Sequence, residues 1–448
     1  TTAIAPQPLG ANVLDAGAAE ALAGNAQVQV VQVKATAGMR FEPSVIEVPA
    51  GTRLLIELTN TDTAQPHDLV LSNGTNGGRL APGATETIDV GVVSGNLDGW
   101  CSIIGHRQMG MTLTITASGA APGSGGSATL PGDMPGMPGM HHGGPDLGRS
   151  LTRADVDLTK APGPDAALVD ASLPLLPPNT GPVQHKVTLP VSEFVAEVAP
   201  GVTQQLWTFG DRAPGPLLHG RVGDTFEVTL INDGTIGHSI DFHAGALAPD
   251  RPMRTIAPGE SLTYIFTATR AGIWMYHCST MPMSAHIASG MFGAVIIEPN
   301  DLPEVDRSYV LVQSEQYLGP MGGEVDMDKL SVAAPDLMAF NGYPSQYDHA
   351  PLPANVGERV RVWVLDAGPN RPSSFHVIGG QFDTVWFEGA YLLNRSPDTG
   401  SQALALQPAQ GGFVELTFPE AGTYPFVSHL MVDAERGAHG LFQVNEAQ

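Results

Sequence analysis

Cysteine is nearly absent from this sequence of 448 residues. The chain has two cysteines, Cys101 and Cys278, so a single disulfide is the most it could form. Each cysteine lies among histidines and methionines in a motif of its own, and we interpret both as metal ligands rather than as a disulfide pair. Cysteine usage therefore does not indicate a redox compartment.

Basic residues are also scarce, with 21 Lys and Arg against 45 Asp and Glu, giving a net charge of -24. Such a surface repels a phosphate backbone, so we expect no nucleic-acid partner. No apolar run reaches the ~20 residues that cross a bilayer, so we expect no membrane span. The start, residues 1–6, carries no charged-then-apolar signal segment. Either the chain is cytosolic or a signal peptide has been removed.

Long amphipathic helical patterns are few, whereas short apolar runs alternate with Gly, Pro, Asn and Asp. This pattern predicts an all-β chain of sandwiches or barrels. Similar segments recur, as in Ala271–His277 and Ala421–Phe426, which indicates copies of one Greek-key sandwich. We predict three cupredoxin-type sandwich domains and one Gly/Pro/Met-rich linker, at residues 1–120, 121–182 (the linker), 183–300 and 301–448. The linker contains a Met/His tract, residues 134–142, which we interpret as flexible or, alternatively, as a weak Cu(I) site.

The stretch Tyr276–Met291 contains Cys278, His286 and Met291 just before an apolar strand. A thiolate, two imidazoles and a weak axial thioether form a blue-copper site. His238, upstream on a predicted strand, supplies the missing imidazole.

The first domain repeats this pattern with His67, Cys101, His106 and Met111. Met109 competes as the axial ligand, but Met111 has the His-to-Met spacing of the other loop. A chance pairing of core Cys and His residues is the alternative. The last domain has no cysteine, so it holds no blue-copper centre of its own.

His277 is left over beside Cys278, and His243 follows His238 by five residues. We predict that they bind a second metal, completed by His429 of the last domain. Three histidines and an open position make a catalytic geometry. The His277–Cys278 peptide would join the two metals covalently.

Asp241 and His376 make a candidate proton-delivery pair near the open position. The alternative for Asp241 is a carboxylate that orients a histidine, and for His376 a satisfied core histidine. We interpret four other histidines as structural: His185, His219, His349 and His439.

From about residue 183 to the end, the chain resembles a copper-containing nitrite reductase. The resemblance rests on these motifs: His238–His243, Tyr276–Ser279, His286–Met291, Phe375–Gly379 and His429. Residues 28–116 resemble a separate cupredoxin, so the whole is similar to the subgroup with a cupredoxin fused ahead of the reductase core. Ala285 stands where an aromatic residue often precedes the ligand histidine, which resembles the second class of the family.

The resemblance implies three coppers per chain, two of type 1 and one of type 2. Type 1 copper in the core would bind His238, Cys278, His286 and Met291, and the first domain would hold the other. Type 2 copper would bind His243 and His277, with His429 donated by a neighbouring subunit of a homotrimer. Asp241 and His376 would deliver protons, and Ile378 would shape nitrite binding.

The implied activity is dissimilatory nitrite reduction to nitric oxide in denitrification, in the periplasm, with an electron-donor protein such as a cytochrome c or a cupredoxin. The sequence leaves open the donor and the pairing of trimers into hexamers. A laccase-like multicopper oxidase is the alternative enzyme, but it needs His-x-His and His-Cys-His motifs; Ser279 follows Cys278, and the sequence has no His-x-His. A copper-storage or electron-carrier protein is the alternative outside the enzymes.

Overall fold

The computed structural model describes residues 27–119 and 148–446. The chain divides into two compact units, Thr1–Pro138 and Gly139–Gln448. The first unit contains the strands β1 (Val28–Thr36), β2 (Arg40–Glu42), β3 (Val45–Pro49), β4 (Thr52–Asn60), β5 (Val70–Leu71), β6 (Thr85–Val93), β7 (Leu97–Trp100) and β8 (Thr112–Ser118).

The second unit begins with the short helix η1 (Arg153–Asp155) and continues as a long series of strands. Its first strands are β9 (Gln184–Ala199), β10 (Val202–Phe209), β11 (Leu218–Arg221), β12 (Thr225–Asn232), β13 (Asp241–Phe242), β14 (Ser261–Thr267), β15 (Gly272–His277) and β16 (Phe292–Glu298). They are followed by β17 (Arg307–Gln316), β18 (Leu337–Phe340), β19 (Leu352–Asn355), β20 (Arg359–Asp366), β21 (Ser373–Val377), β22 (Thr384–Phe387), β23 (Ala390–Leu393), β24 (Leu404–Leu406), β25 (Gly411–Thr417), β26 (Gly422–Ser428) and β27 (His439–Asn445). The α-helices are α2 (Met283–Ala288), α3 (Met327–Ser331), α4 (Gln346–His349) and α5 (Met431–Glu435).

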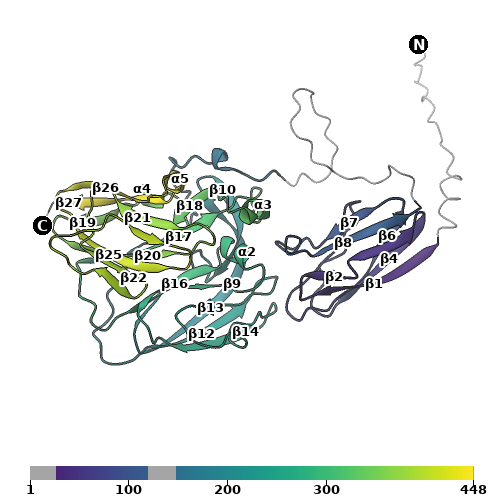
Figure 1. Ribbon diagram of the computed structural model, residues 1–448, viewed down its shortest axis with the longest axis horizontal. Helices are drawn as coiled ribbons and strands as arrows, with labels where there is room; N and C mark the ends of the chain where they lie inside the picture. The colour runs from purple at the N-terminus through teal and green to yellow at the C-terminus, as the bar shows by residue number, and fades with distance from the viewer. Residues whose placement is uncertain (1–26, 120–147, 447–448) are drawn as a thin grey trace, which may run out of the picture. The chain divides into compact units, whose positions relative to one another are not determined.

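The first unit is one sandwich of two four-stranded sheets, in the orders β2-β1-β4-β6 and β3-β8-β7-β5 (Figure 1). Alternate residues of β4 are buried, as the two-residue period of a strand with one covered face requires. The buried side chains form a single apolar cluster between the sheets, which includes Phe41, Leu54, Ile56 and Ile115.

The second unit contains two more sandwiches with the same chain pairing. β1 pairs in parallel with β4 in the first sandwich, as β9 does with β12 and β17 with β20 in the others. The last strand of each sandwich also has a parallel partner: β8 pairs with β3, β16 with β11 and β27 with β19. This repeated topology confirms the predicted fold class of three cupredoxin-type Greek-key sandwiches.

An apolar interface joins the two sandwiches of the second unit. Ile273 and Met275 of β15 lie in one buried cluster with Val312, Trp363 and Phe413. Gly411 lies so close to this strand that an added Cβ would stand 2.5 Å from Cγ2 of Ile273. The two sandwiches therefore pack as one body.

The part of the predicted linker that the structure describes, from residue 148 on, packs against the second unit. Val156 and Leu158 are buried with Leu318 and Leu337, and Ser172 forms a bridge to Tyr309. The Met/His tract lies outside the described residues, and the linker boundaries stay a prediction.

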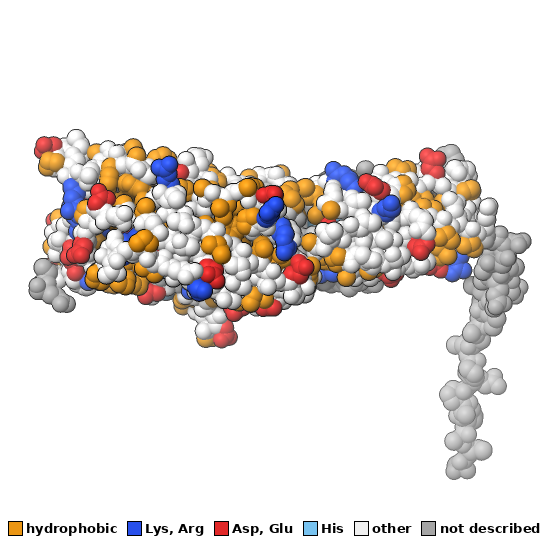
Figure 2. Space-filling model, turned by 90° about the horizontal axis from the view of Figure 1, so that it is seen from below, with side chains coloured by type: hydrophobic (Ala, Val, Ile, Leu, Met, Phe, Trp, Pro, Cys, Tyr) orange, Lys and Arg blue, Asp and Glu red, His pale blue; other side chains and the backbone are white. Residues whose placement is uncertain are grey.

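None of the helices that the structure describes is long and apolar enough to cross a membrane. On the face shown in Figure 2, basic and acidic side chains are interspersed rather than gathered into a patch of one sign.

Candidate metal centres

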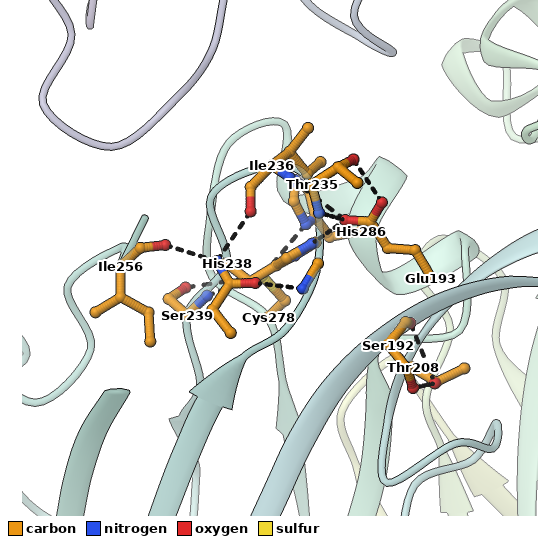
Figure 3. A network of polar contacts seen from close by, with 12 residues as sticks. Ser192, Glu193, Thr208, Thr235, Ile236, His238, Ser239, Ile256, Cys278 and His286 are labelled. Carbon is orange, nitrogen blue, oxygen red and sulfur yellow. Dashed lines mark hydrogen bonds and ion pairs between the residues drawn. The ribbon is translucent and has the colours of Figure 1, made fainter. Parts of the chain in front are cut away.

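A buried set of one thiol and two imidazoles, the core set, lies in the second sandwich, where Figure 3 shows Cys278 with His238 and His286. Sγ of Cys278 is 4.0 Å from Nδ1 of His238 and 3.3 Å from Nδ1 of His286. Cys278 follows β15 directly, and His286 lies on the short helix α2. The fully buried Met291 bonds through its backbone to both Cys278 and His286, at 3.1 Å each.

A matching buried set, the N-terminal set, lies in the first unit. Sγ of Cys101 is 4.0 Å from Nδ1 of His67 and 3.5 Å from Nδ1 of His106. Met111 is fully buried and makes the same backbone bonds to Cys101 and His106 as Met291 makes in the core set. Met109 is only half-buried. This correspondence favours Met111 as the axial ligand, which stays a prediction.

The prediction that His238 lies on a strand is wrong, and His67, its counterpart in the first unit, does not lie on a strand either. Each instead forms an isolated bridge, to Leu80 and to Ile256. The chain between the flanking strands is irregular here because its carbonyls bond to a side chain rather than to a neighbouring strand. In the core, the side chain of Asn232 donates to the backbone carbonyls of Ile236 and Ile256. These bonds hold the ligand histidine without a continuous strand.

Two carboxylates that the sequence reasoning missed orient these histidines. Oδ2 of Asp62 lies 3.3 Å from Nε2 of His67, and Oε1 of Glu193 lies 3.2 Å from Nε2 of His238 (Figure 3). Burial alone would raise the pKa of each carboxyl, but the histidine and nearby N–H and O–H donors lower both to about 2. The carboxylates fix the rings so that Nδ1 faces the sulfur, as carboxylate partners of metal-ligating histidines do.

The two thiols have different electrostatic surroundings. Burial and the nearby Asp68 carboxylate raise the pKa of Cys101 to about 12. Burial would also raise the pKa of Cys278, but hydrogen bonds from His238 and from the backbone N–H of Ser239 lower it below its usual value.

A third set, the His-His-Asp set, lies next to the core set. Nε2 of His243 is 3.1 Å from Nε2 of His277. Nδ1 of His277 donates to the carbonyl of Cys278 at 2.9 Å, which turns Nε2 toward His243. Oδ2 of Asp241 lies 3.9 Å and 4.0 Å from these two Nε2 atoms, because Asp241 pairs with His277 across β13 and β15. Burial and the neighbouring His277 lower the pKa of His243, which keeps it neutral as a ligand must be.

The third sandwich contains the remaining candidates. His376 lies on β21 and His429 follows β26, with their ring centroids 5.4 Å apart. His429 and Ile378 are exposed, and Ile378 is 46% exposed. Within the described parts of one chain, the metal-type sets do not include His429 or His376.

The donors fit copper. Thiolate and imidazole ligands lie about 2.0–2.3 Å from a metal, so separations of 3.3–4.0 Å leave room for one ion between them. A buried Cys/His₂ set with a buried methionine is the donor set of a blue-copper centre, and two imidazoles with an open side suit a Lewis-acid copper.

Comparisons with known proteins agree with this donor chemistry. Residues 12–103 match the cupredoxin-like domain model, and residues 191–301 match the multicopper oxidase model. The copper-containing nitrite reductase of Neisseria gonorrhoeae is 36% identical over 280 residues, which cover 60% of this chain and 70% of the relative. The chain belongs to the copper-containing nitrite reductase family. Copper is therefore the cofactor of this reductase.

Solved structures place the reductase in the same family. The copper nitrite reductase of Nitrosomonas europaea is 35% identical, with a TM-score of 0.54, over 58% of this chain and 94% of that one. A structure named multicopper oxidase is 28% identical, with a TM-score of 0.51, over 62% of this chain and 94% of that one.

Three other histidines of the reductase pair with carboxylates outside the metal-type sets. His185 lies 2.9 Å from Asp224, His219 lies 3.0 Å from Glu298 and His439 lies 2.9 Å from Asp348. His349, at the end of α4, is exposed.

Proposed function

We propose that each chain of this reductase carries two type 1 coppers, in the N-terminal and core sets, and one type 2 copper at His243 and His277. The reaction is the one-electron reduction of nitrite to nitric oxide, in which nitrite, two protons and one electron give nitric oxide and water. When bound, copper supplies electron storage in the Cys/His₂ sets and a Lewis acid at the His-His-Asp set.

One observation carries this proposal: adjacent residues belong to different metal sets. His277 faces His243, while Cys278 faces His238 and His286. The two side chains leave the backbone on opposite sides because they are neighbours at the end of β15. Their shared peptide provides a covalent path for one electron between the sets.

Asp241 and His376 would supply the two protons. Oδ2 of Asp241 lies within 4.0 Å of both Nε2 atoms that would hold the copper, so its carboxyl can reach a substrate oxygen there. Nδ1 of His376 donates to the carbonyl of Gln402 at 2.5 Å, which fixes the ring and leaves Nε2 for the substrate. General acids in this position accelerate the proton transfers.

We further propose a homotrimer in which His429, His376 and Ile378 come from a neighbouring subunit. His376 and His429 already lie together at one exposed place, but apart from His243 and His277 of their own chain. A neighbour that presents both would complete the site. We place the trimer in the periplasm, with a cytochrome c or a cupredoxin as donor.

Measuring products separates this function from its rivals. Copper-loaded protein with nitrite and a reductant should release nitric oxide. A laccase-like oxidase would instead consume oxygen with phenols, and a copper carrier would do neither.

Asp241→Asn should lower kcat for nitrite reduction by about 10²–10⁴-fold, because it removes a general acid. Nitric oxide release with an artificial donor measures the rate, and the blue absorbance should not change. Asp250→Asn, at an exposed loop position, is the matched control and should keep full activity. An Asp241→Asn enzyme as fast as the wild type would show that the carboxylate only orients a histidine.

Cys101→Ala tests the N-terminal copper as a donor or relay. We expect slower turnover with a protein donor and unchanged turnover with a small artificial donor, which can reach the core copper directly. Steady-state rates with both donors measure this. Wild-type rates with every donor would contradict a relay.

A further inference from the structure

The two type 1 sets differ at the residue that follows their first histidine. In the core this residue is Ser239, whose N–H donates to Sγ of Cys278 at 3.4 Å and whose hydroxyl lies 3.8 Å from that sulfur. In the first domain it is Asp68, a buried residue. The Asp68 carboxylate accepts bonds from the backbone N–H and the hydroxyl of Ser102, at 2.6 Å and 2.5 Å. Ser102 is the neighbour of Cys101, so a negative charge lies beside that thiolate.

A group of hydroxyls centred on Ser239 lies near the core sulfur instead. The Thr280 hydroxyl bonds to Ser239 at 3.0 Å and to Thr255 at 2.9 Å, and the Ser279 hydroxyl bonds to Ser239 at 3.0 Å. Ile103 has the position of Thr280 in the N-terminal set and offers no hydroxyl. Figure 3 shows Ser239 next to Cys278 in the core.

Two other features are shared by the two sets. A carboxylate bonds to the first histidine in each, Asp62 in one and Glu193 in the other. A fully buried methionine follows the second histidine by five positions in both. In the core, Trp207 also packs against His238 and His286, but its ring carries no charge, so we attribute the difference in reduction potential to the residues beside the sulfur.

Both differences act in the same direction. A buried negative charge near the ligand thiolate favours the cupric over the cuprous state, because charges interact strongly in a low dielectric. Hydrogen bonds to the sulfur withdraw its electron density and favour the cuprous state. Backbone N–H groups of Asp68 and Ile103 also donate to Cys101, so what distinguishes the two sets is the Asp68 charge in one and the Ser239 hydroxyl near the sulfur in the other.

We propose that Asp68 sets the reduction potential of the N-terminal copper below that of the core type 1 copper, so that electrons pass from the first domain to the core. The inference rests on the proposed type 1 sets. In the transfer, the N-terminal copper goes from the cuprous to the cupric state and the core copper from cupric to cuprous, with one electron moved and no proton. Asp68 is a positioning residue, which acts through the thiolate. We expect the equilibrium to favour the reduced core at least tenfold, which is about 59 mV for one electron.

The test uses the full-length, copper-loaded chain and measures midpoint potentials by following the blue absorbance during a redox titration. Cys278→Ala leaves only the N-terminal blue centre, and Cys101→Ala leaves only the core one. The Cys278→Ala chain, with only the N-terminal centre, should have the lower midpoint potential. Adding Asp68→Asn to the Cys278→Ala chain should raise its midpoint potential by at least about 59 mV, which corresponds to a tenfold change in the equilibrium constant for one electron.

The reciprocal change, Ser239→Asp in the Cys101→Ala chain, should lower the core potential. Asp89→Asn in the Cys278→Ala chain is the matched control: it also removes one negative charge from the first domain, but Asp89 is exposed and paired with Arg53, so water and salt screen it. Its potential should not move. Equal potentials in the two parent chains, or no shift on Asp68→Asn, would overturn the proposal. These titrations contain no nitrite, so they fail or succeed independently of nitric oxide release.

Discussion

His429→Ala will abolish nitrite reduction and leave the blue absorbance of both type 1 centres intact. The loss should exceed the about 10²–10³-fold that removing one stabilising donor costs, because the proposed type 2 copper would lose a ligand. The core set is buried and separate from His429, so its colour does not depend on this residue. Nitric oxide release and the visible spectrum measure the two effects. His349→Ala, another exposed histidine of the same sandwich, is the control and should stay active.

Mixed trimers test which subunit donates His429. His429→Ala and His243→Ala chains are each expected to be inactive alone. When both are expressed together, a site that takes His243 from one variant and His429 from the other is intact. Random assembly makes about a quarter of the sites of this kind. Recovery to about that fraction of wild-type activity is expected, whereas no recovery would show that each chain completes its own site.

The candidate ligands that the structure brings together were predictable because they follow chemistry and short spacing. Cys278, His286 and Met291 lie within one loop, and a thiolate with imidazole and thioether neighbours has few other uses. The first sandwich repeats the pattern, so each set supports the other. The strand periodicity likewise predicted three sandwiches, which the shared strand pairing confirms.

The residues that hold the ligands were not predictable in the same way. Glu193 lies on β9, 45 residues before the His238 that it orients, and no spacing rule links them. Asp62 is only five residues before His67, but an acidic residue at that distance is common. Nor did the apolar pattern show α2, because a helix of six residues has no resolvable period. Tertiary packing decides where Glu193 and Asp62 lie and where the helix α2 forms.

Asp68 and Ser239 were visible in the sequence, beside the predicted ligands His67 and His238. Their position beside the ligand sulfur atoms was not visible in the sequence, because either side chain can turn toward solvent. Only the bonds from Ser102 to Asp68, and from Ser239 to Cys278, place them beside the sulfur atoms.

Cys278→Ala should stop nitrite reduction with every donor, protein or artificial, while the N-terminal blue absorbance remains. The reason is the path: His277 is the residue next to Cys278, so the thiolate and a type 2 ligand share one peptide. Copper held by His243 and His277 should remain and keep its electron paramagnetic resonance signal. Cys101→Ala is the matched control, because it removes the other thiolate and should retain turnover with an artificial donor.

The first domain cannot substitute for this path. The residue before Cys101 is Trp100, whose ring stacks with the guanidinium of Arg107 at 4.4 Å and offers no metal ligand. A copper in the N-terminal set would therefore lack an imidazole joined to its thiolate, and we expect its electrons to enter through Cys278. Residual nitric oxide production by the Cys278→Ala chain with a protein donor, lost when Cys101→Ala is added, would show instead that the N-terminal copper reduces the type 2 site directly.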